Sequence, residues 1–464
     1  MRKDLSFAGA EKQHYEIRSI ISIAEGFAER GVPIISKENI GDPVNKGEAP
    51  PDWMKDIIGI PLLSEGMKNL ILGAIGNSGL EDEERIREHI LKHTNDSSAY
   101  GYSPTKGAMA AREFLAERTN SRGGARITPE DILFFNGLGD SISKVYSLLS
   151  PSVRVIGPSP AYSTHSSAEA SHANSNSITY PLDPYNRWLP DLDDLRKHLK
   201  YNDSISGILV INPNNPTGAV YPRDILEGIV DLAEEFDQFL IFDEIYMNLS
   251  YNGNDVVPLC EIIRDVPGIS MQGISKEWPW PGARCGWIEA YNISSDNVFG
   301  TYFNSIYEAK MTEVCATTHP QIVLPEVEKD PRYEAHIRSR NERFRQRAEK
   351  AADYLSGIDG VIAHQAEGAF YMTIMFEEGV LDGKQELEID NNDAREYFRD
   401  ASRDAALDTR FVYNLIGSKG IITVPLTTFD CPHNGFRVTL LEQDEEKFDW
   451  TFRALRESIE EYIG

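Results

Sequence analysis

The sequence is poor in cysteine, contains no long hydrophobic run and shows no metal-binding motif. Its four cysteines lie far apart and form no Cys-x-x-Cys pair, which argues against a disulfide framework and a zinc site. No His-Glu-x-x-His motif or comparable histidine cluster occurs, so we expect no catalytic metal. No stretch approaches the roughly 18 apolar residues of a membrane span. The start of the chain also lacks the apolar segment of a secretory signal, so we expect a cytoplasmic protein.

Positive charge is scarce. Lysine and arginine number 46 against 73 aspartates and glutamates, which gives a net charge of −27. Such a surface repels phosphate backbones and anionic lipids, so we expect neither nucleic acid nor membrane as a partner. Solubility or adaptation to salt is the simplest explanation of the acidity. An arginine that binds an anion must create its own local positive field in this protein.

The chain is long enough for more than one hydrophobic core. It has 464 residues, of which 41% are hydrophobic and 26% charged, as in an ordinary soluble globular protein. Residues 11–31 predict an amphipathic helix that ends at Gly31.

Between about residues 130 and 290, short uncharged apolar runs alternate with helical patterns. Runs of this kind, bounded by Gly, Pro, Asn or Ser, are typical of parallel strands covered on both faces. The alternation predicts a doubly wound α/β domain, with residues 286–290 as an antiparallel strand of the same sheet. The predicted buried strands are 132–137, 153–157, 208–212, 239–244 and 270–275.

After about residue 320 the pattern changes. A long charged helix at 332–356, an acidic stretch at 382–393, a strand near 435 and a terminal helix predict an α+β unit. We expect the N-terminal segment to pack with this unit. The predicted domains are therefore a large one, 53–320, and a small one made of 1–52 and 321–464.

Polar residues follow the predicted strands, and ligands bind outside the carboxyl ends of such strands. The Asn-Gly-Leu-Gly-Asp turn at 136–140 enters a helix and offers backbone amides to an anion, unless it is an ordinary turn. Residues 212–218 form a rigid, proline-rich turn. Asp243 ends a buried strand, where it caps a helix or meets a cation. Lys276 directly follows an apolar strand, where a lysine either snorkels or serves as a desolvated nucleophile.

Four motifs in this order resemble the fold-type I enzymes that use pyridoxal 5'-phosphate (PLP), specifically the class I and II aminotransferases. The resemblance runs from about Ile40 to Arg437. It implies an α/β fold with a mostly parallel seven-stranded sheet in a large domain and a smaller α+β domain. It also implies transfer of an amino group from an amino acid to a 2-oxo acid with ping-pong kinetics. The motifs are the turn at 136–140, Asn-Pro-Asn-Asn-Pro-Thr-Gly at 212–218, Asp-Glu-Ile-Tyr at 243–246, and Ser-Lys with Pro-Gly-Ala-Arg-Cys-Gly-Trp at 275–287.

The resemblance assigns catalytic roles to Lys276, Asp243 and Tyr246. Lys276 would form a Schiff base with PLP, and Asp243 would pair with the ring nitrogen. Asn215 and Tyr246 would hydrogen-bond the phenolic oxygen of the ring, and Tyr162 would stack on it.

The same resemblance assigns phosphate and substrate contacts. Arg284 would bind the phosphate through its planar guanidinium, and Arg437 would bind the substrate α-carboxylate, with Gly41 and Asn215 also at the substrate. Tyr102 would reach the phosphate of a neighbouring subunit, which implies a homodimer. The remaining phosphate contacts would come from the amides of Leu138, Gly139 and Asp140 and from Ser275.

Some features depart from the family pattern. Gly273 stands where the family often has a Ser or Thr that contacts the phosphate, with Ser275 as a possible substitute. No second arginine for a side-chain carboxylate is evident. Trp278 and Trp280 either belong to the core or border the pocket.

Two alternative functions stay open at this point. A PLP-dependent β-lyase or an amino-acid decarboxylase would use the same lysine, aspartate and arginines. A PLP-binding regulator without turnover is disfavoured, because only about 40 residues precede Gly41 and the charge is wrong for DNA.

Overall fold

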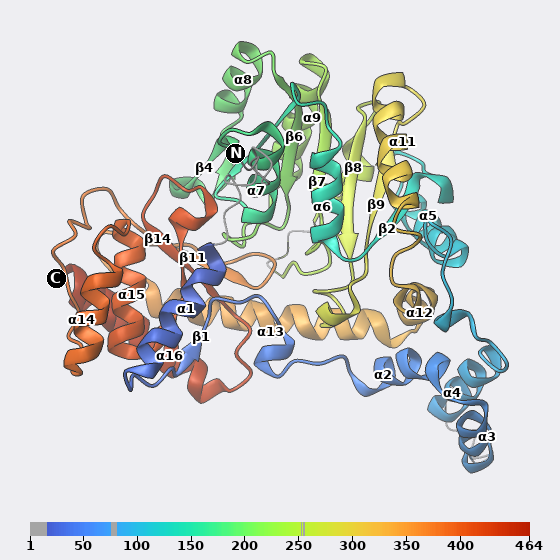
Figure 1. Ribbon diagram of the computed structural model, residues 1–464, viewed down its shortest axis with the longest axis horizontal. Helices are drawn as coiled ribbons and strands as arrows, with labels where there is room; N and C mark the ends of the chain where they lie inside the picture. Colours follow the sequence, from blue (N-terminus) through green and yellow to red (C-terminus); the bar gives the residue numbers. More distant parts are fainter. Residues whose placement is uncertain (1–15, 76–80, 252, 254–255) are drawn as a thin grey trace, which may run out of the picture. The chain divides into compact units, whose positions relative to one another are not determined.

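The computed structural model describes residues 16–75, 81–251, 253 and 256–464. The chain divides into two compact units (Figure 1). Unit 1 comprises residues 1–48, 149–258 and 339–464, and unit 2 comprises residues 49–148 and 259–338. The division into 53–320 and the remainder stays a prediction.

Unit 1 contains a sheet of five strands in the order β7-β6-β3-β4-β5. The first four strands are parallel, and only β5 is antiparallel to its neighbour. Residues of β6 are almost wholly buried because helices cover the sheet (Figure 1). The strands are β3 (Arg154–Ser159), β4 (Ile178–Asp183), β5 (Leu189–Pro190), β6 (Ile205–Ile211) and β7 (Phe239–Asp243), and the helices are α7 (Ser163–Ala173), α8 (Leu192–Tyr201) and α9 (Arg223–Glu235).

Unit 1 also contains an antiparallel sheet in the order β10-β11-β14-β13. The N-terminal segment lies beside it, because β1 pairs in parallel with β12 and α1 contacts α14 and α15. The elements are α1 (Glu16–Glu29), β1 (Ser36–Lys37), β10 (Val361–Ala363), β11 (Tyr371–Phe376), α14 (Asn392–Ala401), α15 (Leu407–Lys419), β12 (Ile421–Ile422), β13 (Val424–Pro425), β14 (Gly435–Thr439) and α16 (Glu445–Ile463).

Unit 2 contains three antiparallel strands in the order β2-β9-β8. Helix α6 packs on β2, β8 and β9, and α12 contacts α2 and α5. Helix α13 (Arg332–Leu355) begins in unit 2 and ends in unit 1. The strands of unit 2 are β2 (Ile132–Phe135), β8 (Gly268–Gly273) and β9 (Gly286–Tyr291). Its other helices are α2 (Asp52–Gly59), α3 (Glu65–Ala74), α4 (Glu81–Lys92), α5 (Met109–Ser121), α6 (Leu138–Ser147), α10 (Leu259–Ile262), α11 (Asn297–Met311) and α12 (Thr318–Lys329).

The predicted fold class is confirmed. The fold is α/β, with a large mixed sheet of mostly parallel strands and a smaller antiparallel sheet. The strand predicted at 286–290 is antiparallel, as expected. Of the helix predicted at 11–31, residues 11–15 lie outside the described residues. Among the helices described, none is both long and apolar enough to cross a membrane.

Candidate active site

Asp243 ends β7 and carries a buried carboxylate. Its Oδ2 accepts a hydrogen bond from Nε2 of His165 at 3.1 Å, and its Oδ1 accepts from the amide of Ile245 at 3.1 Å. His165 lies on α7 and is also buried. A buried carboxylate is costly unless donors surround it, and the imidazole fixes the orientation of this one. The sequence analysis did not identify His165.

Arg437 lies on β14 and is only 3% exposed. Its Nη1 donates to Oδ1 of Asn215 at 3.0 Å, and its Nη2 donates to the carbonyl of Asn39. The guanidinium carbon lies 4.4 Å from the ring centroid of Tyr371. Burial lowers the pKa of Arg437.

No carboxylate of the described residues pairs with Arg437, and its Nε has no hydrogen-bond partner. A buried charge without a counter-charge is expensive. The guanidinium is therefore suited to an anionic ligand with two oxygens, such as a carboxylate.

Two phenols adjoin this arginine. The hydroxyl of Tyr246 donates to the hydroxyl of Tyr371 at 3.0 Å, and both side chains are buried. Burial raises the pKa of both Tyr246 and Tyr371, so both remain neutral donors. A Cβ atom at Gly41 would lie 1.8 Å from the Tyr371 hydroxyl, so only glycine fits there. Tyr371 thus links predicted site residues that are far apart in the sequence.

Two other predicted residues lie at element ends in unit 1. Asn215 is buried within the 212–218 turn, which its neighbour Asn214 stabilises by accepting from the Thr217 amide at 3.2 Å and hydroxyl at 2.8 Å. Tyr162 is half-buried at the start of α7, with its ring edge-on to His165 at 6.4 Å.

In unit 2, Gly137 and Arg284 meet at the N-terminus of α6. Gly137 has φ +82°, and a Cβ atom there would lie 2.5 Å from Nη2 of Arg284. That same Nη2 donates to the carbonyl of Asn136 at 3.3 Å, and the arginine is exposed. Asp140 donates its amide to the Gly137 carbonyl at 3.1 Å, which leaves the first two amides of the helix for an anion. A helix N-terminus beside an arginine is suited to a phosphate.

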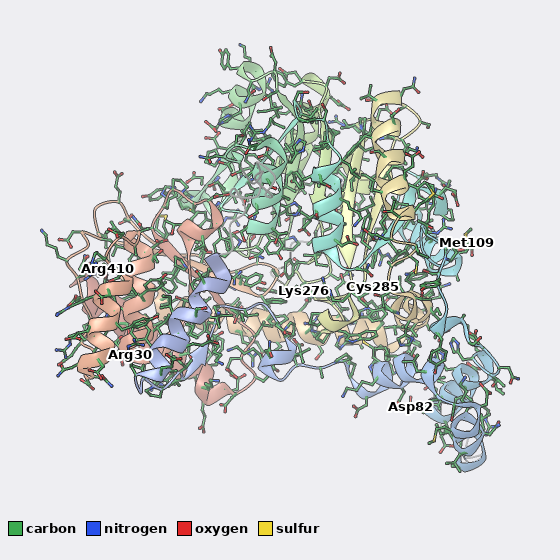
Figure 2. The ribbon with its side chains drawn as sticks, in the orientation of Figure 1. Arg30, Asp82, Met109, Lys276, Cys285 and Arg410 are labelled. Carbon is green, nitrogen blue, oxygen red and sulfur yellow. The ribbon has the colours of Figure 1, made fainter. Side chains whose placement is uncertain are left out.

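Ser275 and Lys276 lie in the turn after β8, and both are half-buried. Figure 2 marks the place of Lys276. At Gly273, the last residue of that strand, a Cβ atom would lie 2.8 Å from the carbonyl oxygen of Cys285. The departure of Gly273 from the family pattern therefore has a steric reason: no side chain fits.

The two tryptophans of this loop differ. Trp278 is fully buried and belongs to the core, whereas Trp280 is half-buried with its ring edge-on to His319. Tyr102 is 86% exposed, which is unusual for so large a ring.

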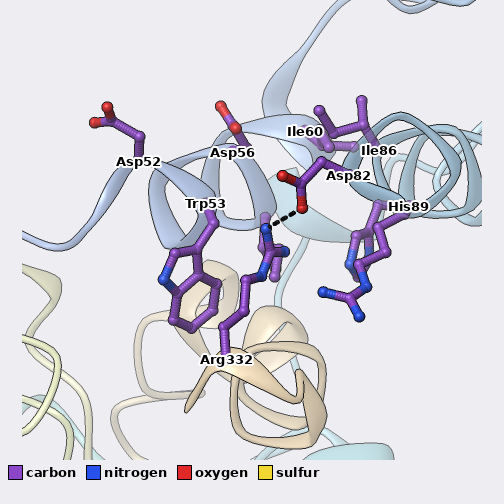
Figure 3. A pocket seen from close by; sticks show the side chains of 10 residues that line it. Asp52, Trp53, Asp56, Ile60, Asp82, Ile86, His89 and Arg332 are labelled. Carbon is purple, nitrogen blue, oxygen red and sulfur yellow. Dashed lines mark hydrogen bonds and ion pairs between the residues drawn. The ribbon is translucent and has the colours of Figure 1, made fainter. Parts of the chain in front are cut away.

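A pocket of about 320 Å³ opens between α2, α4 and Arg332 (Figure 3). Its arginine is neutralised within unit 2: Arg332 donates to Asp82 at 2.9 Å and to Asp330 at 2.8 Å, and stacks on Trp53. None of the predicted site residues lines it. Unlike Arg437, Arg332 leaves no charge for a ligand to satisfy.

Comparison with known proteins gives the family. The family described as aminotransferase class I and II matches residues 70–449. The chain is 52% identical, over the full length of both proteins, to an uncharacterized aminotransferase of Methanocaldococcus jannaschii. It is 29% identical to the glutamate-pyruvate aminotransferase AlaA of Escherichia coli over 67% of this chain and 76% of that one. The crystal structure of alanine aminotransferase from Pyrococcus furiosus matches with a TM-score of 0.79 at 23% identity, covering 99% of this chain and 100% of the other.

The chain belongs to the class I and II aminotransferases. It is an enzyme, and its cofactor is PLP. The residues of this aminotransferase fit the cofactor on physical grounds. Asp243 presents a fixed, buried carboxylate of the kind a pyridinium nitrogen requires, and Arg284 with the start of α6 presents donors for a phosphate. Lys276 offers the amine for a covalent link.

Proposed function

We propose that this aminotransferase exchanges amino groups between a small amino acid of the alanine type and 2-oxoglutarate. Its relatives named glutamate-pyruvate and alanine aminotransferase support this substrate class. The crowding of Tyr246 and Tyr371 beside Arg437 is also consistent with a small side chain on the amino donor. The 2-oxoglutarate would bind in the second half-reaction of a ping-pong cycle.

The observation that carries the proposal is the buried guanidinium of Arg437, which no carboxylate in the described part of the chain neutralises. Every amino acid and every 2-oxo acid offers the α-carboxylate that this group lacks. Two parallel charge-assisted hydrogen bonds fix the substrate as well as bind it. Asn215 holds the guanidinium in place, and Gly41 keeps the approach open.

The chain's own groups then act on the positioned substrate. Lys276 would hold the cofactor covalently and, once the substrate amine has displaced it, would take the α-proton at its Nζ and deliver it to the cofactor. Bound PLP supplies an electron sink at the carbon that loses this proton. Asp243, oriented by His165, keeps the ring nitrogen protonated. Tyr246 and Asn215 would hydrogen-bond the ring oxygen, and Tyr162 would stack on the ring.

Phosphate binding is assigned to Arg284, Ser275 and the start of α6. The isolated, exposed ring of Tyr102 supports the idea that it serves the site of a second subunit, in a homodimer. We place the enzyme in the cytoplasm, in amino-acid biosynthesis. At the start of α6 the phosphate contacts would come from the amides of Leu138 and Gly139, whereas the amide of Asp140, assigned the same role by the resemblance, donates to the Gly137 carbonyl.

The test is a panel of half-reactions on the PLP-loaded enzyme, in which each amino acid is added without a 2-oxo acid. Alanine and glutamate should convert the cofactor to its amino form fastest, with release of pyruvate and 2-oxoglutarate. Preference for aromatic or branched amino acids would reject the proposed substrate class. Ammonia released together with pyruvate would instead indicate the β-lyase reaction.

A further inference from the structure

Asn39 has a buried side chain whose polar atoms are unsatisfied. The residue follows β1 and precedes the turn at Gly41. It is 1% exposed, yet neither Nδ2 nor Oδ1 has a hydrogen-bond partner among the residues that the structure describes. Leaving one buried polar group unpaired costs about 1–3 kcal/mol, so such a group in a folded protein needs an explanation.

Other buried asparagines of unit 1 use their amides. Asn414 is fully buried, and its Oδ1 accepts from the amide of Leu387 while its Nδ2 donates to the carbonyl of the same residue at 3.2 Å. Asn214 likewise stabilises the turn at 212–218. Asn39 therefore departs from the bridging role that buried asparagine has elsewhere in this unit.

The unsatisfied amide lies close to Arg437. The backbone carbonyl of Asn39 accepts from Nη2 of this arginine, and only a few covalent bonds separate that carbonyl from Nδ2. Arg437 itself has an unpaired Nε and no carboxylate among the described residues. Asn39 and Arg437, which this hydrogen bond joins, thus have three unsatisfied side-chain atoms between them: Nδ2 and Oδ1 of Asn39 and Nε of Arg437. One oxygen-rich ligand would accept from the two donors among them, Nδ2 of Asn39 and Nε of Arg437.

We propose that Nδ2 of Asn39 is a second donor to the substrate α-carboxylate that Arg437 binds. This inference rests on the proposed function and adds a substrate-binding residue to it. A carboxylate has about four acceptor positions, of which a bidentate guanidinium uses two. A neutral amide adds a directional hydrogen bond to the remaining oxygen positions without adding a second buried charge.

The first test compares Asn39→Leu with the matched control Asn414→Leu. Leucine has the same branched skeleton as asparagine but a larger volume, so both variants remove the amide and add the same bulk to a buried site. We expect Asn39→Leu to raise the KM of alanine and of glutamate equally, by about tenfold. Its maximal half-reaction rate and cofactor absorbance should be retained. Its melting temperature should not fall, because the lost amide had no partner in the free enzyme.

Asn414→Leu should behave in the opposite way, with a lower melting temperature and an unchanged KM. An Asn39→Leu variant that melts as low as Asn414→Leu, or that keeps the wild-type KM, would overturn the proposal. An increase in KM confined to glutamate would also overturn it, because the amide would then bind the side-chain carboxylate of glutamate and not the α-carboxylate.

Asn39→Asp is the second variant, and it keeps the shape of the side chain. The new carboxylate would give Arg437 the counter-charge that it lacks and would compete with the substrate. We expect a higher melting temperature, and a KM raised by more than tenfold that recovers as the pH falls and the aspartate becomes protonated. A pH-independent KM would overturn the proposal. Absence of transamination in the wild-type enzyme would reject the proposed function itself. An active wild-type enzyme whose KM does not change on substitution of Asn39 would reject only this inference.

Discussion

The imidazole of His165 and the carboxylate of Asp243 lie 3.1 Å apart, and both groups are buried. The histidine comes from the helix that follows β3, and the aspartate from the end of β7. A buried hydrogen bond of this kind fixes the orientation of the carboxylate.

His165→Leu should therefore weaken the pairing of Asp243 with the cofactor ring. Loss of a hydrogen bond to a charged group costs about 1.5–3 kcal/mol, which corresponds to roughly a ten- to hundredfold drop in kcat/KM. The dissociation constant of PLP should rise as well. His172→Leu is the control, because His172 lies on the same helix and its Nε2 hydrogen-bonds the Val153 carbonyl at 3.1 Å. Equal kinetics in both variants would contradict the assigned role.

Lys276→Ala should abolish turnover and the visible absorbance of the bound cofactor together, because it removes the half-buried amine after β8 that we propose forms the covalent link. Mass spectrometry after borohydride reduction should find the adduct on Lys276 in the wild type and on no residue of the variant. Ser275→Ala, one residue away, should keep the adduct. A reduced adduct on any other lysine would show that the covalent site is elsewhere.

Arg437→Lys should raise the KM of every amino acid while the cofactor stays bound, because lysine lacks the planar fork of guanidinium. The loss of one charge-assisted contact predicts about a tenfold or larger effect. Arg340→Lys is the matched control: Arg340 is also buried, but Glu48 neutralises it at 2.8 Å. That variant should lower the melting temperature and leave KM unchanged. The reverse pattern would remove Arg437 from the site.

Much of the fold of this enzyme could be predicted from its sequence. A strand that is buried on both faces consists of apolar residues, and polar residues follow it where it ends. β2 and β7 were predicted in this way, and each leads directly into a predicted site turn. β4 was missed because exposed Pro181 separates Tyr180 from Leu182 in a strand buried on one side. The contacts of His165, Tyr371 and Asn39 could not be predicted, since each joins segments 78 to 398 residues apart.

The contact between Tyr371 and Gly41 shows how a close approach between distant segments constrains one residue. Gly41→Ala should place a Cβ atom against the Tyr371 hydroxyl, displace the ring that stacks on Arg437 and raise KM. Adding Tyr371→Phe removes the oxygen that lies 1.8 Å from that Cβ but keeps a ring carbon 2.7 Å away, so the double variant should recover only in part. Gly66→Ala, with open space around it, is the control. A strictly additive double variant would contradict the contact.

Gly273 gives the opposite test, because the residue typical of the family should be harmful here. Gly273→Ser would add the hydroxyl that related enzymes often use for the phosphate, but its Cβ would lie 2.8 Å from the Cys285 carbonyl oxygen and 3.1 Å from the Cα of Gly286. Both are backbone atoms of paired strands and cannot move away freely. We expect a loss of about 1–3 kcal/mol in stability and no gain in PLP affinity. Thermal unfolding and cofactor titration should be compared with Gly282→Ser, where the added atom meets nothing within 4 Å. Tighter PLP binding at unchanged stability would mean that the strand accommodates the side chain and that steric exclusion is not the reason for the glycine at this position.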